Sequence, residues 1–337
     1  MDPSITPRQR IWQAIRHERT DVVPYQINTT IPAREKLAAH FGTHQLDDLL
    51  GNHIVRYKSR LEYVPLPEPG LFLDEWGVVW NRSIDPDLGV PANRVLVQPN
   101  LDTLALPDPL DPRRYAGLES FFAANPTRFR LFSVSFSLFE RAWTLRGMEQ
   151  LMVDMVEAPS FVEALLDRIL DWDMAVLDRM LAYPFDGVLF GDDWGQQRGL
   201  LFGATRWRRF IKPRVAAMYR KVTDAGKAVC IHCCGKVQEL FPDLIEIGVQ
   251  VFNPFQPEVM DLREVKARFG SDLAFYGGLS VQQLLPFGTP QQVRDEVRSL
   301  IADLGRGGGF IIAPSHEMPG DVPLENMLAF IEAVQSQ

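Results

Sequence analysis

The chain of 337 residues has an ordinary globular composition, with 46% hydrophobic and 23% charged residues. Its formal net charge of -8 argues against nucleic-acid or anionic-membrane partners, because both require basic surfaces. The three cysteines crowd into Cys230–Cys234, which excludes a disulfide framework, and no apolar stretch is long enough to span a bilayer. We therefore expect a cytoplasmic protein that acts on a small molecule.

Short apolar runs rich in branched and aromatic residues predict buried strands, and helical patterns separate most of them. The predicted strands are 22–27, 129–136, 186–192, 228–233, 249–254, 273–278 and 309–314. The predicted helices are 147–180, 206–225, 236–247, 262–269, 289–304 and 323–333. This alternation predicts an α/β protein with a parallel sheet and crossover helices. A count of seven or eight strands favours a closed (β/α)8 TIM barrel, with an open sheet as the alternative.

The alternation breaks over about residues 58–111, which are rich in proline and contain a predicted hairpin at Leu73–Trp80. We interpret this stretch as an insertion that lies over the barrel mouth. The whole chain, residues 1–337, is then a single domain.

Polar residues follow five of the predicted strands, at the end where such barrels place their chemistry. These residues are Asp192, Asp193 and Gln197, then His232 to Gly235, Asn253, Tyr276, and Ser315 to Glu317. Packing alone does not explain this convergence. The Asp192–Asp193 pair is a candidate general acid or base, because like charges raise a carboxyl pKa. A helix cap or an arginine partner is the structural alternative.

His232 and Cys234 lie on the same side of an extended segment, because side chains of a strand alternate. Imidazole and thiolate together suit zinc, and a catalytic zinc needs a third protein ligand. His316, after the last predicted strand, is the favoured third ligand, ahead of Glu317. The alternative is that His232 and Cys234 are ordinary residues of the barrel wall.

The other two cysteines, Cys230 and Cys233, are not predicted to bind the metal. Cys233 should point away from His232 into the barrel wall, and Cys230 should pack in the core as a small hydrophobic residue. Glu140 follows another predicted strand end and either reaches the site or pairs with a nearby arginine.

Taken in order, these motifs resemble the uroporphyrinogen decarboxylase superfamily over nearly the whole chain. The resemblance rests on Asp192–Gly195, His232–Gly235, Asn253–Pro254, Tyr276–Gly278, Pro314–His316 and Pro323–Asn326, with Arg8–Ile11 and Asp21–Pro24 near the start. It implies a (β/α)8 barrel. The superfamily includes the decarboxylase of haem biosynthesis and cobalamin-dependent methyltransferases.

The two branches imply different chemistry. The decarboxylase needs no metal and holds its tetrapyrrole with an arginine-rich N-terminal segment, which residues 1–30 lack. The methyltransferase branch resembles this chain in its His-x-Cys motif, which binds zinc there. A second cysteine usually completes that site, where this chain has Ser315-His316.

The resemblance therefore implies a zinc-dependent methyltransferase, with His232, Cys234 and His316 as metal ligands. Its methyl group would pass to or from a corrinoid (cobalamin) on a separate partner protein. Asp192 or Asp193 would orient the substrate or move a proton. Residues lining the pocket would be Glu140, Gln197, Asn253 and Tyr276. The alternatives are a metal-free decarboxylase of a porphyrinogen or smaller acid, and a non-catalytic protein that binds a corrinoid or another small molecule.

Overall fold

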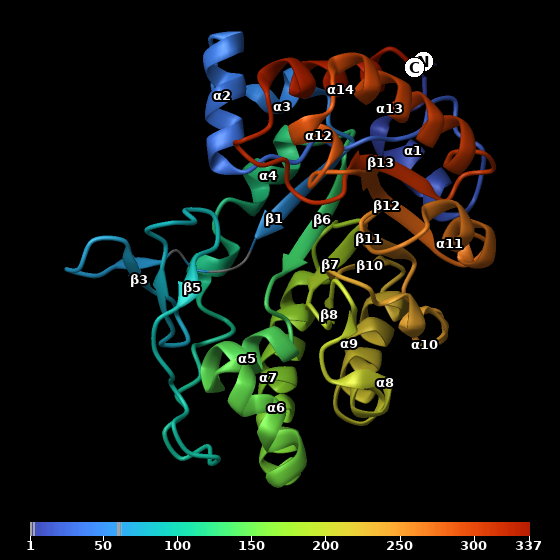
Figure 1. Cartoon of the computed structure of the whole chain (residues 1–337). Coiled ribbons are helices and arrows are strands. Elements are labelled where there is room, and N and C mark those ends of the chain that lie inside the picture. The colour runs from blue at the N-terminus through green and yellow to red at the C-terminus, as the bar shows by residue number, and fades with distance from the viewer. Residues whose placement is uncertain (1, 3, 59–60, 62) are drawn as a thin grey trace.

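A seven-stranded parallel sheet forms the centre of the protein in a computed structural model that describes residues 2, 4–58, 61 and 63–337 (Figure 1). The strand order is β1 (Ile54–Lys58), β6 (Phe129–Val134), β7 (Gly187–Gly191), β10 (Ala228–His232), β11 (Val251–Phe255), β12 (Ala274–Leu279) and β13 (Phe310–Pro314). Every neighbouring pair in this order is parallel, as strands joined by crossover helices must be. The structure confirms the predicted α/β class.

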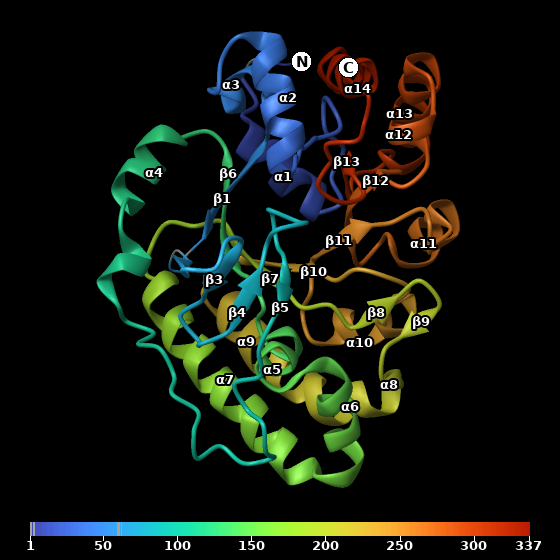
Figure 2. The same ribbon diagram turned by 60° about the vertical axis from the view of Figure 1, so that its left-hand side comes forward.

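Helices surround the sheet (Figures 1 and 2). They are α1 (Pro7–Ile15), α2 (Ile31–Phe41), α3 (Leu46–Leu50), α4 (Leu118–Ala124), α5 (Phe139–Arg146), α6 (Met148–Glu157), α7 (Pro159–Met180), α8 (Gly203–Arg206), α9 (Lys212–Asp224), α10 (Phe241–Glu246), α11 (Leu262–Phe269), α12 (Leu284–Phe287), α13 (Pro290–Leu304) and α14 (Leu324–Gln335). Across the described ranges, none is both long and apolar enough to cross a membrane.

The eighth place in the barrel wall is taken by segment 22–29, which is not a regular strand. Tyr25 forms an isolated parallel bridge with Ile312 of β13, where the N–H of Gln26 donates to the Ile312 carbonyl at 2.9 Å. On the other side, the N–H of Tyr25 donates to Nδ1 of His53 at 3.2 Å. The His53 N–H also donates to the Tyr25 carbonyl at 3.3 Å, but side chains take part in the neighbouring bonds. Among the described residues this side therefore forms no regular ladder, and the prediction of a strand at 22–27 is wrong.

His53 makes this closure sensitive to acid. Burial lowers the pKa of His53 to about 4, from 6.5. The unfolded chain binds a proton near pH 6.5 while the folded chain resists it. The stability that depends on neutral His53 is therefore complete above about pH 6.5, falls as the pH drops, and is lost below about pH 4.

We expect this loss to reach roughly 3 kcal/mol between neutral pH and pH 4. The His53→Asn variant keeps an acceptor for the Tyr25 N–H but does not titrate. Denaturant unfolding at pH 7 and pH 4.5 should show a smaller pH dependence for this variant than for the wild type. Equal pH dependence in the two proteins would contradict the assignment.

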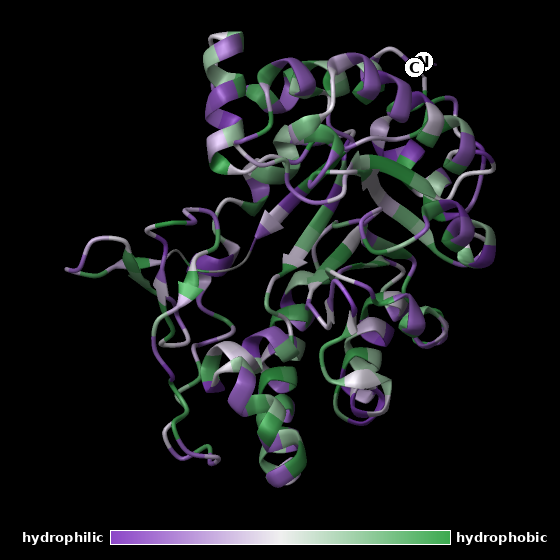
Figure 3. Ribbon diagram, viewed as in Figure 1, coloured by the Kyte–Doolittle hydropathy of each residue, from purple (hydrophilic) through white to green (hydrophobic). Residues whose placement is uncertain are grey.

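Strand β1 is absent from the predicted strands, because Arg56 and Lys58 interrupt its apolar pattern. It nevertheless pairs in regular parallel register with β6, from Ile54 opposite Phe129 to Lys58 opposite Ser133. Figure 3 shows β1 partly in the hydrophilic colour, whereas β13 is mostly hydrophobic. Alternation along β1 places Arg56 on the same side as Ile54, which packs inside the barrel.

Two clusters of buried side chains form the core. The inner cluster fills the barrel and includes Ile11 and Ile15 of α1, which meet the first residues of several strands. The larger, outer cluster lies between the sheet and the helices. Cys230 belongs to the inner cluster and Cys233 to the outer one, so both predictions for these cysteines are confirmed.

A small antiparallel sheet lies outside the barrel. Its strands are β2 (Val64–Pro65), β3 (Leu71–Leu73), β4 (Val79–Asn81) and β5 (Val90–Pro91), in that order. The pairing of Leu73 with Val79 confirms the predicted hairpin. In Figure 1 the arrows of β1 and β6 point toward the side on which this sheet lies. The interpretation of residues 58–111 as an insertion includes 59, 60 and 62, which lie outside the described residues.

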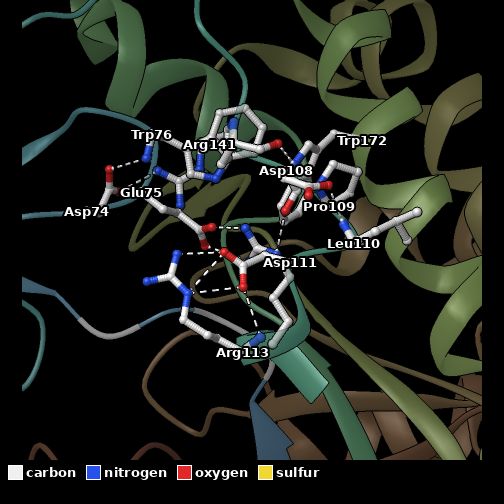
Figure 4. Close-up of polar contacts among 12 residues, drawn as sticks. Asp74, Glu75, Trp76, Asp108, Pro109, Leu110, Asp111, Arg113, Arg141 and Trp172 are labelled. Atoms are coloured by element: carbon white, nitrogen blue, oxygen red, sulfur yellow. Dashed lines mark hydrogen bonds and ion pairs between the residues drawn. The ribbon is translucent and has the colours of Figure 1, made fainter. Parts of the chain in front are cut away.

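Buried ion pairs join this part of the chain to the barrel (Figure 4). The carboxylate of Asp74 accepts the N–H groups of Trp76 and Val78, and an Nη1 hydrogen of Arg141 at 2.8 Å. Asp74 and Arg141 are 2% and 3% exposed in their side chains, so the pair is sealed from solvent. The Arg141 guanidinium also lies 5.0 Å from the ring centre of Trp76.

Candidate functional site

Three side chains with metal-binding atoms meet at the carboxyl ends of β10 and β13. One potential ligand atom each of His232, Cys234 and His316 lies within 4.8 Å of the others. The rings of His232 and His316 have centroids 5.3 Å apart. The structure thus brings together all three residues predicted as metal ligands, from positions up to 84 apart in the chain.

A second layer of contacts fixes the orientation of His232. Its Nδ1 lies 2.6 Å from Oδ1 of Asn253, an oxygen that can only accept, so Nδ1 carries the proton. Nε2 is then unprotonated and faces Cys234. The Asn253 amide nitrogen donates to the Tyr276 carbonyl at 2.9 Å, which holds its oxygen toward the histidine. Such an outer partner is typical of histidines that bind metal.

The spacing of the donors fits zinc. A tetrahedral zinc with ordinary Zn–S and Zn–N bonds sets sulfur and nitrogen about 3.5 Å apart. Sγ of Cys234 and Nε2 of His232 are 3.5 Å apart. One thiolate and two imidazoles form a donor set that zinc accepts, with a fourth position open.

The glycine of the motif has a packing role. Gly235 has φ +87° and lies against the β8 (Gly195–Gln196) and β9 (Gly199–Leu200) hairpin. A Cβ at Gly235 would approach the Gln196 nitrogen to 2.5 Å. Only glycine fits both the conformation and the contact, and the resulting turn sets Cys234 beside His232.

Asp192 caps a helix. Its carboxylate accepts the N–H of Phe139 at 3.1 Å and of Glu140 at 2.7 Å, at the start of α5, and the indole N–H of Trp194 at 2.6 Å. Burial raises the pKa of Asp192 to about 6, although these three donors oppose the shift. The structural alternative, a helix cap, therefore describes Asp192.

Asp193 and Glu140 are half-buried carboxyl groups near the candidate metal ligands. Oδ1 of Asp193 accepts the N–H of Cys234 at 2.7 Å. Burial raises the pKa of Glu140 well above its usual range, and the charges of Asp193 and Asp192 raise it further. Burial and the neighbouring carboxylates thus both favour the neutral form of Glu140.

The two other predicted pocket residues, Tyr276 and Gln197, differ in burial. Tyr276 is 1% exposed inside the barrel, and its hydroxyl oxygen accepts from Asn28 at 2.8 Å and Arg56 at 3.0 Å. Gln197 is exposed in the β8–β9 turn and, among the described residues, makes no hydrogen bond to the others. Its predicted place in the pocket therefore stays a prediction. Arg56, which the sequence did not single out, contacts the predicted pocket residue Tyr276 through its hydroxyl, and the alternation within β1 is the signal that could have identified it.

Comparison with known proteins identifies a family match over most of the chain. The family model described as "Uroporphyrinogen decarboxylase (URO-D)" matches residues 93–337. A uroporphyrinogen decarboxylase of Mannheimia succiniciproducens is 25% identical over 186 residues, 53% of this chain and 49% of the relative. A methylated-thiol–coenzyme M methyltransferase of Methanosarcina mazei is 27% identical over 195 residues, 58% of this chain and 50% of the relative.

The chain thus spans about half the length of the curated relatives it matches. Among solved structures, a methyltransferase from Methanosarcina mazei aligns with a TM-score of 0.76. It covers 98% of this chain and 99% of its own at 17% identity, which establishes the shared fold.

Proposed function

Because the chain belongs to the uroporphyrinogen decarboxylase (URO-D) family, we propose that it is a zinc-dependent methyltransferase. It moves a methyl group between a small methylated substrate or thiol and a corrinoid cofactor on a separate protein. The observation that carries this proposal is the group of His232, Cys234 and His316, with donor atoms within 4.8 Å. The methyltransferase relative from Methanosarcina mazei supports the same reaction class.

Each side chain around the group has a role in this proposal. Asn253 fixes the tautomer of His232 so that Nε2 faces the metal position. Asp193 holds the backbone of Cys234. Glu140, whose pKa is raised well above its usual range by burial, is the candidate proton donor at the mouth. When bound, zinc would supply Lewis acidity that lowers the pKa of a thiol, alcohol or water.

The charge of the three candidate metal ligands also affects which chemical group can accept the methyl. Two neutral imidazoles and one thiolate give the site a single negative ligand charge. A second thiolate in place of His316 would give two. The lower ligand charge makes the metal a stronger Lewis acid, which favours an acceptor group that is harder to deprotonate.

The test combines metal content with turnover. Purified protein from zinc-supplemented cells should contain about one zinc per chain. Incubation with methylcobalamin and a thiol should form the methyl thioether, detected by mass spectrometry. Absence of zinc after supplementation would overturn the proposal. Release of carbon dioxide from uroporphyrinogen under anaerobic conditions would instead establish the decarboxylase alternative. Tight corrinoid binding without turnover, unchanged by His232→Ala, would establish a binding protein.

A further inference from the structure

Asp173 of α7 is a carboxyl group in the protein interior, where a charge needs a partner. It is 2% exposed, and among the described residues no basic nitrogen lies within 4.0 Å of its carboxylate. Its Oδ2 has no hydrogen-bond partner in the same set. The buried carboxylates of Asp74, Asp154 and Asp186, by contrast, each pair with an arginine. Burial without such a pair favours a neutral carboxyl group, or a second arrangement in which it gains a cation.

Asp173 borders a cavity of about 30 Å³ between the barrel and the insertion. This volume is far too small for an organic ligand. The wall also contains Arg141, which pairs with Asp74, and Arg114, which pairs with Glu75. Both acidic partners belong to the β3–β4 hairpin or its turn. Asp173 therefore faces the two guanidinium groups that hold this hairpin against the barrel.

The turn of the hairpin keeps its shape through bonds of its own. The Asp74 carboxylate accepts the N–H groups of Trp76 and Val78, each at 2.9 Å, so these bonds can move with the hairpin. Arg141 instead belongs to α5, and its guanidinium lies 5.0 Å from the Trp76 ring centre (Figure 4). If the hairpin moved away, Asp74 would leave with it, and Arg141 would remain on the barrel beside Asp173.

The charged groups around Asp173 come from several elements. Burial raises the pKa of Asp173 well above its ordinary value, Arg141 of α5 opposes this shift, and Asp192 after β7 adds to it. Glu75 of the hairpin turn and Arg114 face the same cavity as an ion pair. Among the described residues of the wall, those of β6 are uncharged. Solvent that enters when the hairpin moves would remove the burial and lower the pKa again.

We propose that Asp173 is the alternative partner of Arg141, so that the β3–β4 hairpin lifts from the barrel as Asp173 loses its proton. In the docked state Arg141 pairs with Asp74, and Asp173 holds a proton. In the lifted state Asp74 is in solvent, Arg141 pairs with the Asp173 carboxylate, and the proton has passed to solvent. Arg141 is paired in both states, so lifting avoids the cost of a buried unpaired cation.

The linkage gives this movement a direction with pH. The docked hairpin is fully stabilised at low pH, and this stabilisation falls as the pH rises toward the docked pKa of Asp173. The hairpin lies on the side toward which the arrows of β1 and β6 point (Figure 1). Its movement therefore changes access to the carboxyl ends of the strands.

Hydrogen exchange of peptides that cover residues 74–80, followed by mass spectrometry between about pH 5.5 and 8.5, tests the proposal. Asp173→Asn keeps the size of the side chain but cannot ionise. Wild type and variant have the same sequence in these peptides, so intrinsic exchange cancels in the ratio of their rates. The ratio of wild type to Asp173→Asn should rise with pH, by up to about tenfold per pH unit, the limit for one linked proton. A ratio that does not change with pH would overturn the proposal.

Two further variants serve as controls. Asp171→Asn removes an exposed acid from the same helix and should exchange as the wild type does at every pH. Asp74→Asn needs no change at Asp173: it frees Arg141 to pair with Asp173 in the docked state, so lifting releases little proton. Exchange at Trp76 and Val78, corrected for its intrinsic rate, should then depend less on pH than in the wild type. An effect of Asp171→Asn equal to that of Asp173→Asn, or an unaltered pH dependence in Asp74→Asn, would contradict the exchange of partners.

Discussion

Replacing Cys234 with serine should empty the candidate metal site and abolish methyl transfer. Serine removes the soft, anionic ligand that zinc prefers and leaves two neutral imidazoles. Removing a residue that only hydrogen-bonds to a metal ligand typically lowers the affinity for the metal by about 10- to 100-fold. We therefore expect loss of the thiolate to reduce zinc affinity by more than about 100-fold. Zinc per chain, measured by elemental mass spectrometry after dialysis, reports the result.

Cys233 is the matched control, because it is one residue away on the opposite face. Its sulfur accepts the N–H of Trp194 at 3.3 Å in the outer core, a bond that a serine hydroxyl can also accept. The Cys233→Ser variant should retain its zinc. The metal assignment would be wrong if Cys234→Ser kept a full complement of zinc, or if Cys233→Ser lost it equally.

Replacing Arg141 with methionine should cause the largest loss of stability. The substitution keeps an unbranched apolar stem but leaves the carboxylate of Asp74 buried without its cation. Breaking one partner of a buried pair costs about 3–5 kcal/mol. Thermal and urea unfolding followed by circular dichroism measure the change.

Arg113 provides the comparison within the same region (Figure 4). It pairs with Asp111 at 2.6 Å, but its side chain is 74% exposed. Solvent screens an exposed pair, so Arg113→Met should unfold almost as the wild type does. Similar melting temperatures for the Arg113 and Arg141 variants would contradict this prediction. They would show that burial of the Asp74–Arg141 pair does not determine how much the pair stabilises the protein.

Local alternation explains what could be predicted from the sequence. The period of two along β10 separates His232 and Cys234 from Cys233, and the structure confirms these directions. Parallel strand order brings His316 to the same edge, because all carboxyl ends of a parallel sheet meet there. These predictions needed only the spacing within a strand and the order of the strands.

Other features depend on contacts between distant segments. Asp192 caps α5 because that helix begins directly beside its strand end, which no local pattern of Asp192 and Asp193 reveals. Strand β1 was not predicted because Arg56, a charged residue that lines a cavity, interrupts the apolar pattern by which a strand is recognised. Segment 22–29 has a strand-like composition, but side chains satisfy some of its backbone donors.

Barrel closure by segment 22–29 links the order of synthesis to the fold. This segment leaves the ribosome well before its backbone partners Ile312 and Met318, which follow it far along the chain. At translation rates of about 5–20 residues per second, they emerge roughly tens of seconds apart. During that interval the nascent chain keeps one side of segment 22–29 without its backbone partner. The backbone contacts that close the barrel therefore form only after Ile312 and Met318 have been synthesised.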